Sequence, residues 1–473
     1  MSQSRRDFLR KTGCALSMAA LATQVEHFGL VSALARGDDA GGDYKALVCI
    51  FLNGGNDGNN TVVPNHNSGS ISNYTSYSNV RGASGLAIPQ ASLLPITVPR
   101  MGGLAYGLHP NLLELQTLWN AQKLAVVCNV GTLVQPMTRT TYQNNTVPKP
   151  YQLFSHSDQV QQAQASNSAT PTSYGWGGRT SDLTAGQNPG ASIPMITSVA
   201  GSQLFTAGLL TKPLAVNPAP TALNQLLTLS GYNTSAESVA RRTAYDQLRT
   251  VDLSSNVVRA SRDITQEAVN ASVALNLPDP TITTPFPNTS LGNQLRQVAK
   301  FLAIRNTLNI NRQIFFCSLG GFDTHTGELA AHVTLLSQLS QAMKAFYDLT
   351  VELGIADKVT TFTLSDFGRT FLPSGSGVSV GSDHAWANHM FVMGGSVLGG
   401  DFYGMNTSNG TPFPTLQLSG PDDTDNRGRF IPTTAVDQYA ATLASWYGLA
   451  AADLPTVFPF LSNFGSNNLG FLM

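Results

Sequence analysis

The chain has 473 residues, of which 42% are hydrophobic and 12% charged, and its formal net charge is -1. A chain of this length holds either roughly two to three domains or one large α/β domain with insertions. The sparse, balanced charge excludes a nucleic-acid-binding basic patch and a solvating acidic tail. A surface rich in Gly, Asn, Ser and Thr instead suits an exported or wall-associated protein.

The N-terminus carries the features of an export signal. Arg5 and Arg6 precede a weakly apolar stretch, and the small residues Ala33 and Ala35 form a cleavage site. This segment resembles a twin-arginine signal, so residues 1–35 are set apart from the fold. The alternative is a basic helix that begins the protein. The signal predicts the twin-arginine translocase as a partner during export, and a periplasmic or secreted location.

Two further features describe the mature chain. No later apolar run approaches the roughly 20 residues that span a bilayer, so no transmembrane segment is expected there. Cys49, Cys128 and Cys317 each lie within a strand-like apolar run. That position predicts buried, reduced thiols rather than metal ligands or disulfides.

The first half of the chain predicts a βαβ order. A core strand begins near residue 44, and the Gly/Asn-rich turn after it is expected to break any helix. Residues 65–105 are expected to form a long surface excursion. The periodicity of Leu112, Leu115 and Trp119 predicts a helix that leads directly into a second strand. A further helix is expected to begin near Trp176, and a strand near Ser192.

The second half alternates helices and strands more clearly. An insertion or cap is expected at about 204–288, with helices at 236–253 and 264–275. The later predicted elements are a helix at 289–305, strands at 313–319, 359–364 and 389–395, and helices at 328–353 and 435–449. The helix at 328–353 is expected to turn inward a stripe made of Leu329, Val333, Leu336, Met343 and Phe346.

Carboxylates follow three of the predicted strands, each beside glycine. They are Asp57, Asp323 and Asp366, and a fourth cluster holds Asp383, His384 and His389. In an open α/β sheet, ligands collect outside the carboxyl ends of the strands. Asp and His without Cys are typical of a hard or borderline metal centre. The pattern therefore predicts one metal site, with His325 as a further ligand beside Asp323.

Several of these residues have a structural alternative. Asp57 could instead be a turn-forming residue, and Asp323 or Thr324 could cap the helix that follows. Arg369 either forms a structural ion pair or holds an anionic substrate group. His156 is left open as a ligand or a substrate contact. Asp383 is expected to orient its neighbour from outside the ligand set.

Eight motifs in order resemble one exported bacterial family, called domain of unknown function fifteen-oh-one. They are RRDFLRK, FLNGGNDGNNTVVP, GLHPNL, LFSHSDQ, GGFDTH, SDFGRT, SDHAWANH and VMGGSVLGGDFYG. The resemblance covers nearly all of residues 1–473. It implies an alkaline-phosphatase-like α/β fold, a three-layer sandwich with a mostly parallel central sheet flanked by helices. Residues 36–473 would then form a single domain.

The resemblance also assigns roles to matching positions. It implies metal ligation by Asp57, Asp323, His325 and Asp366. Phe367 stands where the superfamily has a histidine, so His384 and His389 are expected to supply the missing ligand. One or two divalent cations are implied, with zinc favoured and calcium or manganese as alternatives. The expected nucleophile is Thr138, beside Arg139, with Thr132 as a rival.

The leading hypothesis is an exported metal-dependent hydrolase of phosphate or sulfate esters. Its substrate would be a small anionic ester or a sulfated or phosphorylated polymer, steadied by Arg369 or Arg139. The alternative is a catalytically inactive alkaline-phosphatase-like module that binds a polymer or a co-encoded exported protein. Phe367 and the unassigned nucleophile favour that alternative. A redox enzyme with an organic cofactor has no G-x-G-x-x-G motif to support it.

Overall fold

A nine-stranded sheet organises the chain, seen here in a computed structural model that describes residues 44–69, 72–228 and 234–473. The predicted signal at 1–35 lies outside the described residues. The strand order is β11-β5-β10-β9-β1-β8-β6-β7, with β12 beside β5. The strands are β1 Lys45–Asn53, β5 Leu124–Gly131, β6 Ile196–Ser198, β7 Leu214–Ala215, β8 Arg312–Gly320, β9 Val359–Ser365, β10 Asn388–Gly394, β11 Phe402–Tyr403 and β12 Thr434–Ala435.

All pairings in this sheet are parallel except those of β10, which runs antiparallel to both β5 and β9. A strand that runs against its neighbours begins at the edge where they end. The residues just before β10 therefore reach the edge where the chain leaves β1, β8 and β9. The predicted meeting of the GGFDTH, SDFGRT and SDHAWANH motifs depends on this reversal.

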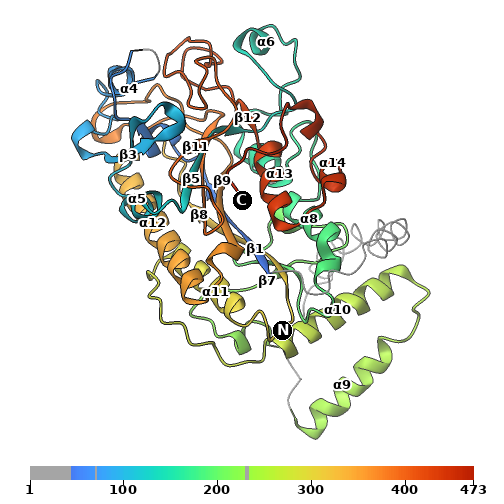
Figure 1. Cartoon of the computed structure of the whole chain (residues 1–473). Helices are drawn as coiled ribbons and strands as arrows, with labels where there is room; N and C mark the ends of the chain where they lie inside the picture. The colour runs from blue at the N-terminus through green and yellow to red at the C-terminus, as the bar shows by residue number, and fades with distance from the viewer. Residues whose placement is uncertain (1–43, 70–71, 229–233) are drawn as a thin grey trace.

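Helices cover both faces of the sheet, as Figure 1 shows. On one face lie α5 Leu113–Asn120, α11 Ser290–Ala303 and α12 Glu328–Glu352; on the other lie α7 His156–Ala165, α8 Trp176–Thr184, α13 Val436–Tyr447 and α14 Leu454–Val457. Side chains of β1 alternate between the two layers of core, with Val48 on one side and Cys49 on the other. The predicted α/β sandwich with a mostly parallel sheet is confirmed.

The buried strands explain why the apolar runs were predictive. A parallel strand covered on both faces has apolar side chains along its whole length. The side chains of β1 from Ala46 to Leu52 are at most 2% exposed. Cys49, Cys128 and Cys317 are buried and free, as their positions in such runs predicted.

The segment expected as a surface excursion forms a second, smaller sheet. The antiparallel strands β2 Val62–Pro64, β4 Leu104–Leu108 and β3 Leu94–Val98 pair in that order, and α4 Tyr74–Arg81 packs beside them. The expectation was wrong because short alternating runs bury one face. In β3, for example, Ile96 and Val98 are buried while their neighbours are exposed.

Two local expectations were also wrong. The turn after β1 contains a one-turn helix, α3 Gly58–Thr61, because the Asp57 side chain accepts a hydrogen bond from the Asn59 backbone and caps it. In α12, Val333 is 48% exposed, whereas its neighbour His332 is fully buried. The inward stripe therefore passes through His332, one position before the expected Val333, and then through Leu336.

Two long helices stand off the body of the molecule (Figure 1). They are α9 Ala236–Leu248 and α10 Asn256–Ala274, and both lie within the segment predicted as an insertion or cap. That domain division stays a prediction. A short helix, α6 Arg139–Gln143, follows β5. Among the described residues, no helix combines the length and apolar character needed to cross a bilayer.

Candidate metal centre

Four side chains from three separate segments meet at the edge where β1, β8 and β9 end. Asp323 and His325 follow β8, His384 precedes β10, and His156 is the first residue of α7. Each is partly exposed, with side-chain exposure between 24% and 46%, so a ligand can reach them from solvent. We call these four residues the imidazole cluster.

The imidazole cluster converges on one oxygen. The Nε2 atoms of His156, His325 and His384 lie 3.3, 3.0 and 3.3 Å from Asp323 Oδ1. The Nε2 atoms of His325 and His384 are 3.0 Å from each other. The ligand atoms of His156, Asp323 and His384 all fall within 4.8 Å of one another, which is the spacing of groups that share a cation.

The far nitrogen of each ring is anchored by an oxygen. His156 Nδ1 lies 2.6 Å from Asp366 Oδ2, and His325 Nδ1 lies 3.0 Å from Asp383 Oδ1. His384 Nδ1 lies 2.8 Å from the backbone oxygen of Phe154. Carboxylates and carbonyls only accept hydrogen bonds, so each Nδ1 holds a proton, and the Nε2 of a neutral ring would present a lone pair to the cluster. Histidines that bind metals are oriented in this way.

The donor set fits a divalent cation. Among the described residues, the buried His156 Nε2 atom has no well-aligned hydrogen bond, and it approaches Asp323 Oδ1 at 3.3 Å. A buried polar atom in that state is costly unless another ligand satisfies it. Three imidazoles and one carboxylate are ligands that zinc takes in tetrahedral sites. His156, Asp323, His325 and His384 are the residues that would hold the ion.

The local charges keep Asp323 ionised and His384 neutral, but they favour the protonated form of His156. Burial alone would raise the pKa of Asp323, but the hydrogen bond from Arg369 and the nearby imidazoles lower it. The hydrogen bond to Asp366 raises the pKa of His156. Burial lowers the pKa of His384, which keeps that ring neutral. Ser374, His325 and Arg427 overcome the effect of burial and lower the pKa of Asp383 to about 2.

Asp366 reaches the cluster only through His156. Its side chain is fully buried. Its carboxylate accepts hydrogen bonds from the Gly54 backbone at 3.2 and 3.3 Å and from Ser365 Oγ at 3.1 Å. With its oxygens engaged in this way, Asp366 orients an imidazole from outside the cluster. Asp383 takes the equivalent position behind His325, rather than behind the adjacent His384.

Arg369 is fully buried beneath the cluster. Its Nη1 donates to Asp323 Oδ1 at 2.9 Å, and its Nη2 donates to the Ser382 backbone oxygen at 2.5 Å. Of the two alternatives that the sequence left open, the structure shows the ion pair. A guanidinium with no exposed surface contacts substrate less readily than it holds a neighbouring carboxylate in place.

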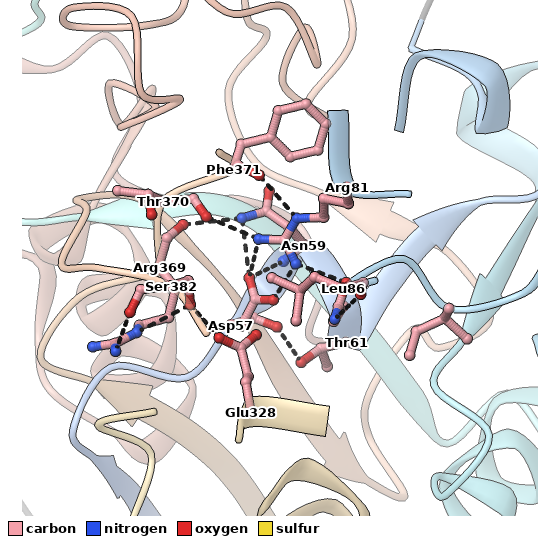
Figure 2. Close-up of polar contacts among 12 residues, drawn as sticks. Asp57, Asn59, Thr61, Arg81, Leu86, Glu328, Arg369, Thr370, Phe371 and Ser382 are labelled. Atoms are coloured by element: carbon pink, nitrogen blue, oxygen red, sulfur yellow. Dashed lines mark hydrogen bonds and ion pairs between the residues drawn. The ribbon is translucent and has the colours of Figure 1, made fainter. Parts of the chain in front are cut away.

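Asp57 has its partners outside the imidazole cluster. Its carboxylate is fully buried and forms a two-pronged ion pair with Arg81, one bond of which joins Arg81 Nη2 and Asp57 Oδ1 at 3.1 Å. Figure 2 shows Asp57 between Arg81 and Glu328. Burial would raise the pKa of Asp57, but the charge of Arg81 and the hydrogen bonds from Glu328 and Arg81 together outweigh it and lower the pKa to about 2. Burial, together with the Asp57 carboxylate, raises the pKa of Glu328 well above its usual range.

His389 also lies apart from the cluster. Its Nδ1 accepts a hydrogen bond from the Asn129 backbone at 3.2 Å, and its ring stacks on Phe413 with centroids 4.9 Å apart. Burial lowers its pKa to about 4. A neutral ring with these partners is a core residue at the start of β10.

The two predicted nucleophiles, Thr138 and Thr132, and the predicted anion-binding residue Arg139 all have local structural partners. Thr138 is exposed and caps α6 in a reciprocal arrangement with Thr141. Arg139 donates to backbone oxygens of residues 420, 423 and 425. Thr132 is buried, and its hydroxyl accepts from Gln159 at 3.3 Å. Within the described residues, no hydrogen bond or ion pair joins any of the three to the imidazole cluster.

Three residues that contact the cluster or the neighbouring Asp57 network could not be identified from the sequence. Phe154 acts through its backbone oxygen, so its side chain carries no trace of the role. Arg81 lies in a polar segment without periodicity, and Glu328 opens a helix where acidic residues are common. Only the arrangement in space identifies them.

Comparison with solved structures finds weak similarity to several proteins. One is "Ps i-CgsB in complex with k-i-k-neocarrahexaose", with 7% identity, coverage of 89% of this chain and 77% of that chain, and a TM-score of 0.32. A second is the PsFucS1 sulfatase from Pseudoalteromonas sp., with 10% identity, coverage of 83% and 68%, and a TM-score of 0.28. A third is a protein in the alkaline phosphatase superfamily from Vibrio parahaemolyticus, with 10% identity, coverage of 91% and 74%, and a TM-score of 0.27.

No curated protein sequence matches the chain. A family match, in contrast, extends over residues 44–413, which is most of the chain and includes every member of the imidazole cluster. The family recognised from the eight motifs is thereby confirmed. The chain belongs to the family described as "Protein of unknown function (DUF1501)".

Proposed function

We propose that the protein is an exported metal-dependent hydrolase of phosphate or sulfate esters. The observation that carries the proposal is the convergence of three imidazole Nε2 atoms on Asp323 Oδ1, with each ring anchored through its Nδ1. Such an arrangement is preorganised for a cation. A cation there would relieve the opposition between the lone pairs of neutral rings that face one carboxylate.

The protein's own residues would each have a defined task. The imidazole cluster would bind the cation, and Asp366, Asp383 and the Phe154 carbonyl would orient its rings. When bound, the divalent cation would neutralise the transferring group and lower the pKa of a water or hydroxyl nucleophile. Zinc suits the ligand set best. The exposed face of the cluster would admit a small anionic ester or the charged group of a polymer.

Metal content and turnover test the proposal together. The mature protein, purified from its export compartment, should hold about one divalent ion in the cluster and hydrolyse p-nitrophenyl phosphate or p-nitrophenyl sulfate. His325→Ala and His384→Ala should each lose the ion and the turnover. His66→Ala is the matched control, since His66 pairs with the Ser68 backbone and Tyr106 instead. Protein that holds no metal and cleaves neither ester would overturn the proposal.

One observation favours a second function, a metal-holding binding protein without turnover. The Thr138 hydroxyl is engaged in a helix cap, and no contact joins it or Thr132 to the cluster in the described chain. A protein of this kind would bind zinc stoichiometrically yet leave both esters intact. It would then retain a sulfated or phosphorylated polymer in a metal-dependent pull-down.

A further inference from the structure

We propose that Arg81 is a positioning residue for the metal centre, acting through the backbone of residues 366–371, which we call the 366–371 loop. The inference rests on the proposed function in one respect, that a cation binds the imidazole cluster. Arg81 touches none of the four cluster residues. Its effect would pass through the loop that carries both Asp366 and Arg369.

All five N–H groups of Arg81 are used, and none reaches solvent. Two donate to Asp57 and one to Asn60 Oδ1 at 2.7 Å. The other two donate to backbone oxygens of the 366–371 loop, that of Thr370 at 2.9 Å and that of Phe371 at 3.1 Å. The side chain is fully buried. Only a guanidinium offers five donors in a fixed plane.

Through Asn59, Asp57 also helps to fix the backbone of Arg369. Its carboxylate accepts from Arg81 and also from Asn59, whose backbone N and side-chain Nδ2 both lie 3.1 Å from Oδ1. Asn59 Nδ2 in turn donates to the Arg369 backbone oxygen at 3.0 Å. Three consecutive carbonyls, those of Arg369, Thr370 and Phe371, are therefore held by one buried ion pair and the neighbouring Asn59 (Figure 2).

The other side of the loop faces the cluster. With its backbone fixed, Arg369 directs its guanidinium at Asp323 Oδ1 and at the Ser382 backbone oxygen. Ser382 Oγ donates to the buried Glu328 carboxyl, which closes the network beside Asp57. At the start of the same loop, Asp366 holds the His156 ring. Two cluster residues, Asp323 and His156, thus depend on the position of this loop.

Lysine in place of Arg81 separates positioning from charge. Arg81→Lys keeps the positive charge beside Asp57 but loses the planar fork that holds the carbonyls of Thr370 and Phe371. Loss of partners outside the ligand set weakens metal binding by about 10- to 100-fold in proteins. We expect a Zn²⁺ dissociation constant raised within that range, and an altered visible spectrum of the Co²⁺-loaded protein.

The experiment measures the Zn²⁺ affinity of the full mature chain by competition with a chromophoric chelator, at a temperature well below the melting temperature of each variant. Arg100→Lys is the matched control, because Arg100 is half exposed and pairs with Asp401 away from the loop. If the Arg81–Asp57 ion pair only stabilised the fold, Arg81→Lys would lower the melting temperature without changing the Zn²⁺ affinity. Folded Arg81→Lys protein with wild-type affinity and Co²⁺ spectrum would therefore overturn the inference.

A milder variant keeps the inference testable if Arg81→Lys does not fold. Asn59→Ala removes the bond to the Arg369 carbonyl while leaving the Arg81–Asp57 pair, and should weaken Zn²⁺ binding several-fold. Unchanged affinity in this variant would equally overturn the inference. Wild-type protein that binds no Zn²⁺ would overturn the proposed function first, so the two failures are distinguishable.

Discussion

The Nε2 atoms of His325 and His384 face each other across 3.0 Å, and each ring holds a proton on its far nitrogen against an oxygen acceptor. Two neutral imidazoles in this position direct lone pairs at each other. A shared proton or a bound cation relieves the opposition, and the nearby Asp323 carboxylate favours either positive charge. A bound cation is one of these two ways to relieve the opposition, so the relationship makes these residues a candidate metal centre.

Removing the charge of Asp366 should weaken the centre without deleting a cluster residue. In Asp366→Asn the amide no longer draws the His156 proton to Nδ1 as strongly, so Nε2 becomes a poorer ligand. The Zn²⁺ dissociation constant should rise by about 10- to 100-fold, measured by chelator competition. Asp158→Asn, in the first turn of the same helix, is the control, because Asp158 pairs with Ser155. Equal affinity in both variants would contradict the assigned role.

Metal affinity should also fall as the solution becomes acidic. Ligands must lose their protons before they bind a cation. The pKa of His156 is raised above 6.5 by Asp366, so protons compete with metal at pH values near neutrality. Isothermal titration between pH 6 and 8 should show affinity rising with pH. In Asp366→Asn the midpoint of the curve of metal affinity against pH should move to lower pH. An unchanged midpoint would argue against His156 as a ligand.

Gly54 should not tolerate a side chain. Its φ of +115° is strained for alanine, and a Cβ there would collide with the backbone N of Asp323. The strain alone costs about 1–3 kcal/mol, and the collision would also displace Asp323 from the cluster. Gly54→Ala should therefore lower both the free energy of unfolding and metal affinity.

Gly103→Ala separates these two effects of the Gly54 change. Gly103 also has a positive φ, +75°, but nothing lies near its missing Cβ. This variant should lose stability alone, measured by urea denaturation, and keep wild-type metal affinity. A Gly54→Ala protein that behaves like Gly103→Ala would show that the close approach to Asp323 has no consequence for the centre.

Asp437 should make stability depend on pH. Burial at the start of α13 raises its pKa to about 7, whereas an unfolded Asp titrates near 3.9. The folded state therefore binds an extra proton between these values. The contribution of protonated Asp437 to the free energy of unfolding is complete below about pH 4, and it is lost as the pH rises through 7. Asp437→Asn should flatten this slope in urea denaturation from pH 4.5 to 8, whereas Asp263→Asn, at a partly exposed position, should retain it.

Thr138→Ala tests the expected nucleophile. The structure predicts only the loss of the α6 cap, about 1 kcal/mol of stability, with turnover of aryl esters retained. Thr138→Ser should keep both the cap and the turnover. Folded Thr138→Ala protein with no turnover would instead identify Thr138 as the attacking group, and would require the α6 segment to approach the cluster when substrate binds.

The sequence predicted the sheet and part of the centre for one physical reason. Strands buried on both faces are apolar throughout, so β1, β8 and β9 and the polar residues after them were visible locally. Asp323, His325 and His384 followed directly. His156 stayed open because its approach depends on how α7 packs against the strand edge. Asp57 looked like a ligand because its partner Arg81 lies 24 positions away in a segment with no apolar pattern.

The separation of the cluster along the chain has a kinetic consequence. His156 and the carboxylate that orients it are 210 positions apart, so we expect the site to assemble only after the long-range strand pairing is complete. A cation that binds this late has nothing to stabilise in the folding transition state. It should leave the refolding rate unchanged and slow unfolding instead, so that the metal lengthens the lifetime of the native protein without helping it to form.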